Sequence, residues 1–325
     1  MEKKPGSPVR LFSTYARSST RRVRLMDGIA GKGTMAAGLL IVALLVLLLN
    51  EMFRLSLPAI CHFGIGFFTS SDWDPQGERF GVLPFLYGTL VSSAIALVIA
   101  IPFGIGTALF LTELAPQRLR GAVAFVVDML AAIPSVVYGL WGVFVLAPLM
   151  QSHVGPFLEK TLGFLPLFRG PFYGGVSMLT AGLILAVMVV PFIVAIAREV
   201  LLTVPVDLKA ASYALGATQW ETIWKVVLPY SRVGIGGGVV LALGRALGET
   251  MAVTMVIGNQ PRINASILQP GYSMAAVLAN EFNEASSKLY LSVLVEVGLT
   301  LFLVTFLINI AARVLLWRMR SVHPH

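Results

Sequence analysis

The sequence predicts an all-α integral membrane protein with six transmembrane helices, and two observations support this fold class. The composition is strongly apolar: of 325 residues, 57% are hydrophobic and only 12% are charged, and the mean hydropathy is +0.83. Six apolar runs are also long enough to cross the hydrocarbon core of a bilayer, which takes about 20 residues. They lie at about 34–53, 83–113, 121–150, 174–198, 233–258 and 289–317.

The first 33 residues are polar and carry eight lysines and arginines. A secretory signal has a short basic region and an apolar core of only about 7–15 residues, and the run at 34–53 is longer than that. We therefore expect a basic cytoplasmic tail over 1–33, a transmembrane domain over 34–317 and a short cytoplasmic tail over 318–325.

The positions of lysine and arginine predict the orientation of the chain. With the N-terminus inside, 17 of the 24 basic residues fall in cytoplasmic segments, namely 1–33, 114–120, 198–232 and 313–325. Because basic residues favour the cytoplasmic side of a membrane, both termini are predicted to be cytoplasmic. The outward segments are then 57–82, 151–173 and 259–288. They suit interfacial turns or docking surfaces for an external partner, and lipid anchoring explains Trp73 and Trp141 equally well.

Prolines fall inside three of the predicted spans, at Pro102, Pro134 and Pro191. Such residues are tolerated in a membrane where neighbouring helices satisfy the freed backbone groups. We expect a kink at Pro134, either beside the pathway of a transported substrate or as a feature of packing.

Charged residues inside the predicted spans are the first candidates for a functional site. Arg245 and Glu249 lie four residues apart, so on a continuous helix they share one face. Intramembrane charges are costly and usually face a bundle interior or a water-filled path. Arg245 suits an anion, because guanidinium is planar and permanently charged, and Glu249 could hold it in place. The alternative is a structural ion pair. Asp128 and Glu296 could be further partners of Arg245, or could line an interface with another subunit.

The cytoplasmic segment 199–229 separates two spans and has a helical pattern of its own. Residues 207–215 can form two helical turns that end at Gly216, and a second helix can follow from Thr218, with Glu221 completing a capping box. Trp220, Ile223, Trp224 and Val227 recur at helical spacing on that second helix. Large aromatic residues on an exposed helix indicate an anchor in a groove of another protein, and a helix lying on lipid headgroups is the alternative.

This loop resembles the "EAA loop" of binding-protein-dependent ABC permeases. The resemblance rests on small residues, then a glycine, then an apolar residue and Leu-Pro ten to thirteen positions later: Ala210, Ala211, Ser212, Gly216, Val226, Leu228 and Pro229. The glutamate usual in the family falls at Ala210, so any salt bridge it makes is missing here. In the family this loop forms coupling helices that sit in a cleft of an ATPase subunit.

Four further stretches are similar to the permease subunits of phosphate-specific ABC importers, and favour the PstC-type over the PstA-type subunit. They are SSDWDP at 70–75, residues 88–116, AAIPSVVYGLWG at 131–142 and GRALGETMAVTMVIGN at 244–259. The resemblance implies the type I ABC importer (MetI-like) permease fold in a bacterial inner membrane. It also implies a homologous second permease (PstA-type), two nucleotide-binding ATPase subunits (PstB-type) and a phosphate-binding protein (PstS-type).

No catalytic residue, metal ligand or cofactor site is expected in this chain. The stretch GIAGKGT at 28–34 departs from the spacing of a phosphate-binding loop, so ATP and Mg are expected on the partner ATPase. Three alternatives remain open at this stage. They are a permease for sulfate or molybdate, a proton-coupled secondary anion transporter that uses Arg245 and Glu249, and a scaffold in which the charges only pair subunits.

Overall fold

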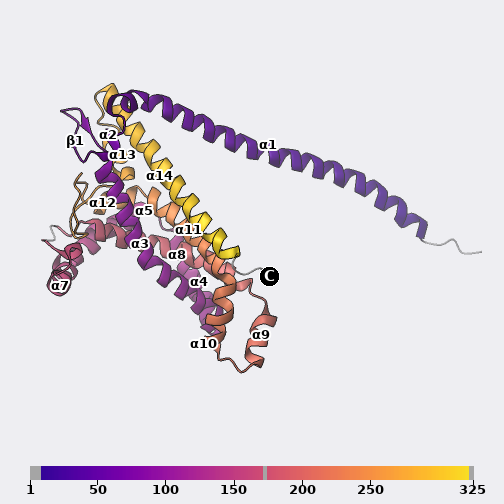
Figure 1. The fold of residues 1–325 in the computed structure, drawn as a ribbon. Helices are drawn as coiled ribbons and strands as arrows, with labels where there is room; N and C mark the ends of the chain where they lie inside the picture. The colour runs from indigo at the N-terminus through magenta and orange to yellow at the C-terminus, as the bar shows by residue number, and fades with distance from the viewer. Residues whose placement is uncertain (1–8, 171–173, 322–325) are drawn as a thin grey trace, which may run out of the picture. The chain divides into compact units, whose positions relative to one another are not determined.

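The computed structural model describes residues 9–170 and 174–321, and within them the chain is almost entirely helical (Figure 1). One short antiparallel hairpin accompanies the helices, with strands β1 (Trp73–Asp74) and β2 (Arg79–Phe80). The α-helices are α1 (Val9–Phe63), α2 (Gly66–Thr69), α3 (Leu83–Leu109), α4 (Gln117–Ala132), α5 (Ser135–Trp141), α6 (Ala147–Leu149), α7 (Gly155–Leu162), α8 (Met178–Leu202), α9 (Val206–Ala214), α10 (Gln219–Thr222), α11 (Leu228–Gly248), α12 (Met251–Val256), α13 (Met274–Glu281) and α14 (Lys288–Ser321). Shorter π-helical and 3₁₀ turns are η1 (Phe110–Leu114), η2 (Gly142–Leu146), η3 (Met150–Val154), η4 (Pro166–Phe168) and η5 (Ile223–Val227).

The chain divides into two compact units, residues 1–54 and 55–325. The first is part of α1, so the tail expected over 1–33 is helical from Val9 onward. Residues 1–8 of that tail, and 322–325 of the expected C-terminal tail, lie outside the described residues. From Met35 to Leu48 the large apolar side chains of α1 are exposed, which suits a helix that meets lipid.

The second unit is organised around the contact between α3 and α8. Two buried glycines permit a close approach: an added Cβ on Gly104 would lie 2.6 Å from Ile193 Cγ2, and one on Gly182 would lie 2.5 Å from Ile95 Cγ2. Small residues at helix contacts let membrane helices pack backbone to backbone. The main apolar cluster surrounds this contact and includes Ala96, Ala100, Ile184 and Leu185.

Two groups of short elements lie at opposite ends of this unit (Figure 1). The hairpin, α2 and α13 gather at one end, where a second apolar cluster contains Phe67, Phe80, Phe85 and Tyr272. Helices α9 and α10 project at the other end. The connection between α8 and α11 is therefore separated from the hairpin by the length of the spans.

Six helices of the described residues are long and apolar enough to cross a membrane, which confirms the predicted fold class. They cover Met26–Phe63, Leu83–Leu114, Ser135–Leu162, Met178–Leu202, Gln219–Gly248 and Lys288–Arg318. Pro102 and Pro191 lie inside α3 and α8, as predicted.

Two of the predicted spans have the wrong boundaries. The run at 121–150 is divided, because the helix stops at Ile133 and restarts after Pro134, so the third span begins at Ser135. Ile133 has extended backbone angles, which a residue before proline favours, and the expected kink is therefore a complete break. The run at 233–258 is likewise divided, because α11 ends at Gly248 and Glu249 is extended.

The contact between α3 and α8 can be tested with two glycines of the same helix. Gly104→Ala is expected to destabilise the protein by about 1–3 kcal/mol, because the new methyl group would overlap Ile193. Gly106→Ala is the matched control, because its added Cβ would point into open space, with no atom beyond its neighbouring residues and the backbone of its own helix within 4 Å. Thermal unfolding of the purified variants in detergent measures the difference. Equal stability of the two variants would show that the α3–α8 contact is looser than described.

Candidate functional site

The loop between α8 and α11 forms the two short helices that the sequence predicts. Helix α9 is followed by Gly216, whose φ of 84° lies in the left-handed region that glycine adopts without steric strain. Thr218 is the N-cap of α10: its hydroxyl accepts a hydrogen bond from the Glu221 amide, and the Glu221 carboxylate accepts one from the Thr218 amide. The predicted capping box is confirmed.

Exposed apolar side chains gather on this loop. Trp220 is 59% exposed and Trp224 is 56% exposed, with their rings edge to face at a centroid distance of 5.8 Å. Leu215, in the turn between the helices, is 90% exposed. The placement of Ile223 and Val227 on the same exposed face is wrong, because both are buried. Val227 packs in the apolar cluster of α3 and α8, so tertiary packing divides the predicted face into a buried side and a side that carries the tryptophans.

The small residues of the loop lie where a second protein could approach them. Ala210 and Ala211 are exposed on α9, and a hydrogen bond of 2.9 Å between the Ser212 and Thr222 hydroxyls joins α9 to α10. Leu228 is half-buried and Pro229 is exposed, directly after the π turn η5 in a helix that runs without a break from Gln219 to Gly248. The Ser212–Thr222 hydrogen bond and the capping box therefore fix the two helices of the loop relative to each other.

The structure separates Arg245 from Glu249, so the predicted shared helix face is wrong. Arg245 lies in the last turn of α11, while Glu249 follows the end of that helix in extended conformation. Within residues 9–170 and 174–321 no ion pair joins them. The Glu249 carboxylate instead accepts a hydrogen bond of 3.4 Å from the Ala252 amide, at the start of α12. The Arg245 side chain is exposed on this chain, beside a break in the spanning helix.

Neither of the other two acids predicted to lie in a span pairs with Arg245 in the described part of the chain. Asp128 is exposed on α4, which lies outside the six candidate spans, so its predicted place within a span is wrong. Glu296 is 3% exposed on α14, and its Oε2 has no hydrogen-bond partner among the described residues. The expectation that these acids partner Arg245 is therefore not met within this chain, because their helices place them in different surroundings.

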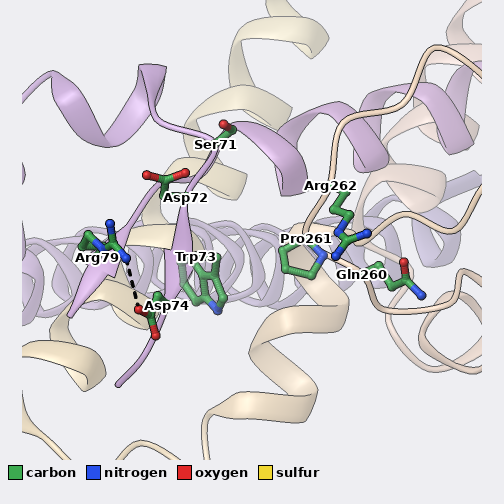
Figure 2. A pocket seen from close by; sticks show the side chains of 8 residues that line it. All are labelled: Ser71, Asp72, Trp73, Asp74, Arg79, Gln260, Pro261 and Arg262. Carbon is green, nitrogen blue, oxygen red and sulfur yellow. Dashed lines mark hydrogen bonds and ion pairs between the residues drawn. The ribbon is translucent and has the colours of Figure 1, made fainter. Parts of the chain in front are cut away.

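A polar pocket of about 560 Å³ opens beside the hairpin at the opposite end of the unit (Figure 2). Arg79 on β2 forms an ion pair of 3.5 Å with Asp74 on β1, and Arg262 contributes a second guanidinium from the segment before α13. The backbone N–H of Gly77, with the nearby Arg79, holds the pKa of Asp74 below its ordinary value. Trp73 lies between the two arginines in the view of Figure 2.

The pocket has a rigid wall, because Trp73 is held by protein contacts. Its Nε1 donates a hydrogen bond of 2.9 Å to Glu281, and its ring meets Phe80 and Phe85 edge to face. Lipid anchoring is therefore not needed to explain Trp73. Sequence reasoning singled out the loop but missed Arg79 and Arg262 as members of one pocket, since they are far apart in the chain and only the fold brings them together.

These features define an inner-membrane component of a transport system, and the comparison with family models agrees. Residues 100–321 match the family of binding-protein-dependent transport system inner membrane components. The chain belongs to this family, and it is a multi-pass membrane protein.

Three curated relatives of this chain are permeases of one kind. The chain is 49% identical to the "Phosphate transport system permease protein PstC" of Mesorhizobium japonicum, over 93% of each chain. It is 45% identical to the protein of the same name from Haemophilus influenzae, over 87% of this chain and 90% of the relative. It is also 38% identical to the "Probable phosphate transport system permease protein PstC" of Methanocaldococcus jannaschii, over 90% and 94%.

Two solved transporters share the fold. A chain of a bacterial alginate ABC transporter matches with a TM-score of 0.57 at 17% identity, over 93% of this chain and 96% of that one. A chain of the MetNI methionine ABC transporter in an inward-facing conformation matches with a TM-score of 0.50 at 22% identity, over 74% and 94%. The predicted ABC importer permease fold is confirmed.

The capping box of α10 can be tested alone. Thr218→Ala removes the hydroxyl that accepts from the Glu221 amide and is expected to cost about 1 kcal/mol of local stability. Amide hydrogen exchange over residues 218–227 should accelerate about fivefold, as such an energy implies. Thr203→Ala is the control, since its exposed hydroxyl bonds only to the Val200 carbonyl in the last turn of α8. Unchanged exchange in Thr218→Ala would mean that packing alone holds α10.

Proposed function

We propose that this chain is the transmembrane permease subunit of an ATP-driven importer that moves inorganic phosphate into the cytoplasm. The observation that carries this is the 49% identity over 93% of both chains to a phosphate transport permease. Identity at that level over the whole membrane domain supports a common substrate more firmly than fold similarity does, because one fold serves many substrates. The chain itself would carry no ATPase site.

The partners follow from the same proposal. A homologous PstA-type permease would complete the pathway, two PstB-type ATPase subunits would bind ATP and Mg, and a PstS-type protein would deliver phosphate. Both termini and the α8–α11 loop would be cytoplasmic, as the distribution of basic residues indicates. The pocket at Arg79 and Arg262 would then open outward, on the side where phosphate arrives.

The loop between α8 and α11 would connect this chain to the ATPase. Its tryptophans and Leu215 are exposed, and large apolar side chains are unfavourable in contact with water. In protein interfaces, by contrast, aromatic side chains are typical central contacts. The loss of the usual glutamate at Ala210 leaves this apolar contact intact.

Arg245 is the residue proposed to meet phosphate within the membrane. It is exposed beside the break between α11 and α12, and no carboxylate of the described residues forms an ion pair with it. Broken helices line substrate paths in membrane transporters, because their freed backbone groups must face a polar cavity or protein. An unpaired guanidinium there can bind phosphate oxygens with charge-assisted hydrogen bonds.

Phosphate uptake by the reconstituted complex tests this role. Arg245→Ala is expected to lower uptake about 100-fold or more, and Arg245→Lys less, because lysine keeps the charge without the planar fork. Radiolabelled phosphate, purified binding protein and ATP would be supplied to proteoliposomes, with subunit assembly checked for each variant.

Arg54→Ala is the matched control and should keep wild-type uptake, because this arginine of α1 is exposed, pairs with exposed Glu51 and lies outside both the pocket and the break in α11. Uptake that is unchanged in an assembled Arg245→Ala complex would contradict a role in the pathway. Uptake of sulfate or molybdate in place of phosphate by the wild-type complex, or uptake without ATP, would contradict the proposed function itself.

The tryptophan pair gives a second test, of assembly instead of transport. Trp220→Ala with Trp224→Ala is expected to weaken the association with the ATPase subunit by about 30-fold, the loss typical of one interfacial hot spot. Co-purification from detergent at defined subunit concentrations measures it. Trp141→Ala is the control, because Trp141 is also exposed but lies in a span. Equal co-purification of the two variants would favour a helix that lies on lipid headgroups.

A further inference from the structure

A short ion pair ties the loop between α8 and α11 to the end of α3. Lys209 Nζ on α9 lies 2.6 Å from Glu113 Oε1 in η1, and the two side chains are 21% and 10% exposed. Three other ion pairs of the described residues are longer, at 3.2–3.5 Å, and have side chains that are 43–73% exposed. Exposed pairs of that kind contribute little, whereas a mostly buried pair fixes geometry, because separating it leaves a charge without a partner.

Glu113 receives a second contact from the same loop. Gln219, the first residue of α10, donates a hydrogen bond of 2.8 Å from its side-chain amide to the Glu113 carbonyl. Both helices of the loop are thus attached to one residue, α9 through the ion pair and α10 through the amide. The Ser212–Thr222 hydrogen bond also joins these two helices to each other.

The chain changes from an α-helix to a π turn next to Glu113. The chain leaves α3 through a π turn, in which the Ala115 amide donates to the Phe110 carbonyl five residues earlier. Leu111 of the same turn is buried in the apolar cluster that includes Leu201 of α8. The turn is therefore anchored to the spans on one side and to the loop on the other.

We propose that Glu113 and Lys209 form the joint through which movement of the loop reaches α3 and, through the close α3–α8 contact, the spans. This inference rests on the proposed function, since it assigns the route by which ATP hydrolysis on the partner would act on the permease. Without the ion pair, the loop keeps its covalent connections to α8 and α11, the hydrogen bond from Gln219 to the Glu113 carbonyl and the packing of Ile223 and Val227, but α9 loses its attachment to α3. Glu113 and Lys209 are positioning residues, which need not touch phosphate or ATP.

The position of Lys209 also bears on the missing family glutamate. Lys209 directly precedes exposed Ala210 and directs its ammonium group to Glu113 of the same chain. In this chain the acid that pairs with Lys209 of the loop is Glu113, which directly follows α3. The restraint on α9 therefore comes from within the permease.

Two double variants distinguish a mechanical joint from a purely structural ion pair. Glu113→Gln with Lys209→Met removes both charges, so no buried charge is left unpaired and the complex is expected to assemble. Glu113→Lys with Lys209→Glu restores the pair in reverse. In proteoliposomes supplied with phosphate-loaded binding protein and ATP, phosphate taken up per ATP hydrolysed should fall about fivefold or more in the neutral variant, the usual scale of coupling between sites. The reversed variant should recover most of it.

Glu51→Gln is the matched control, because it removes an exposed ion pair with Arg54 in α1 and should keep the wild-type ratio. A wild-type ratio in the assembled neutral variant would overturn the proposal. So would a reversed variant that assembles and stays as uncoupled as the neutral one, since the effect would then not come from the ion pair.

A second readout separates this proposal from the choice of substrate. The stimulation of ATP hydrolysis by loaded binding protein is measured in the same samples. If the wild-type complex shows this stimulation but takes up no phosphate, the proposed function fails. The joint is then still judged by whether the neutral variant loses the stimulation and the reversed variant regains it.

Discussion

The close contact between α3 and α8 is the constraint on which the arrangement of residues 55–321 depends. In a bilayer the hydrophobic effect does not drive helices together, so association relies on tight packing and on hydrogen bonds. Gly104 and Gly182 supply the tight packing, because each leaves room for an isoleucine of the facing helix. The main apolar cluster forms around this contact, and the loop that follows α8 begins from a fixed helix end.

Different polar interactions hold the two ends of the helical unit. At one end, the hairpin is held by Trp73 through its bond to Glu281 and its ring contacts, which fixes one wall of a pocket with two arginines. At the other end, the α8–α11 loop is held by a capping box, a hydroxyl pair and the Glu113–Lys209 ion pair. Between the two ends, the break after Gly248 leaves Arg245 without a carboxylate partner in the described chain. Under the proposed function, these three features would serve as an outward approach, a polar path and a connection to the ATPase.

Most local features of the loop were predictable because they depend on residues close together in sequence. The capping box needs only Thr218 and Glu221, and the turn needs only a glycine where φ is positive. The same local reasoning failed for Ile223 and Val227, whose burial depends on helices far away in the chain. It failed again for Arg245 and Glu249, since helical periodicity assumes an unbroken helix and the backbone breaks between them.

The sequence by itself determined the membrane class, the number of spans and the type of permease. Long apolar runs are stable only where lipid surrounds them, so they indicate a membrane protein. The motifs of the loop and the spans consist of residues close together in the chain, so they indicate the type of permease. Only the tertiary structure decided which charges meet. Glu113 and Lys209 are 96 residues apart, and Arg79 and Arg262 are farther still, so no periodicity relates them. The physical reason is that the energy of a charge depends on its nearest neighbours in space, which in a helical bundle come from other helices.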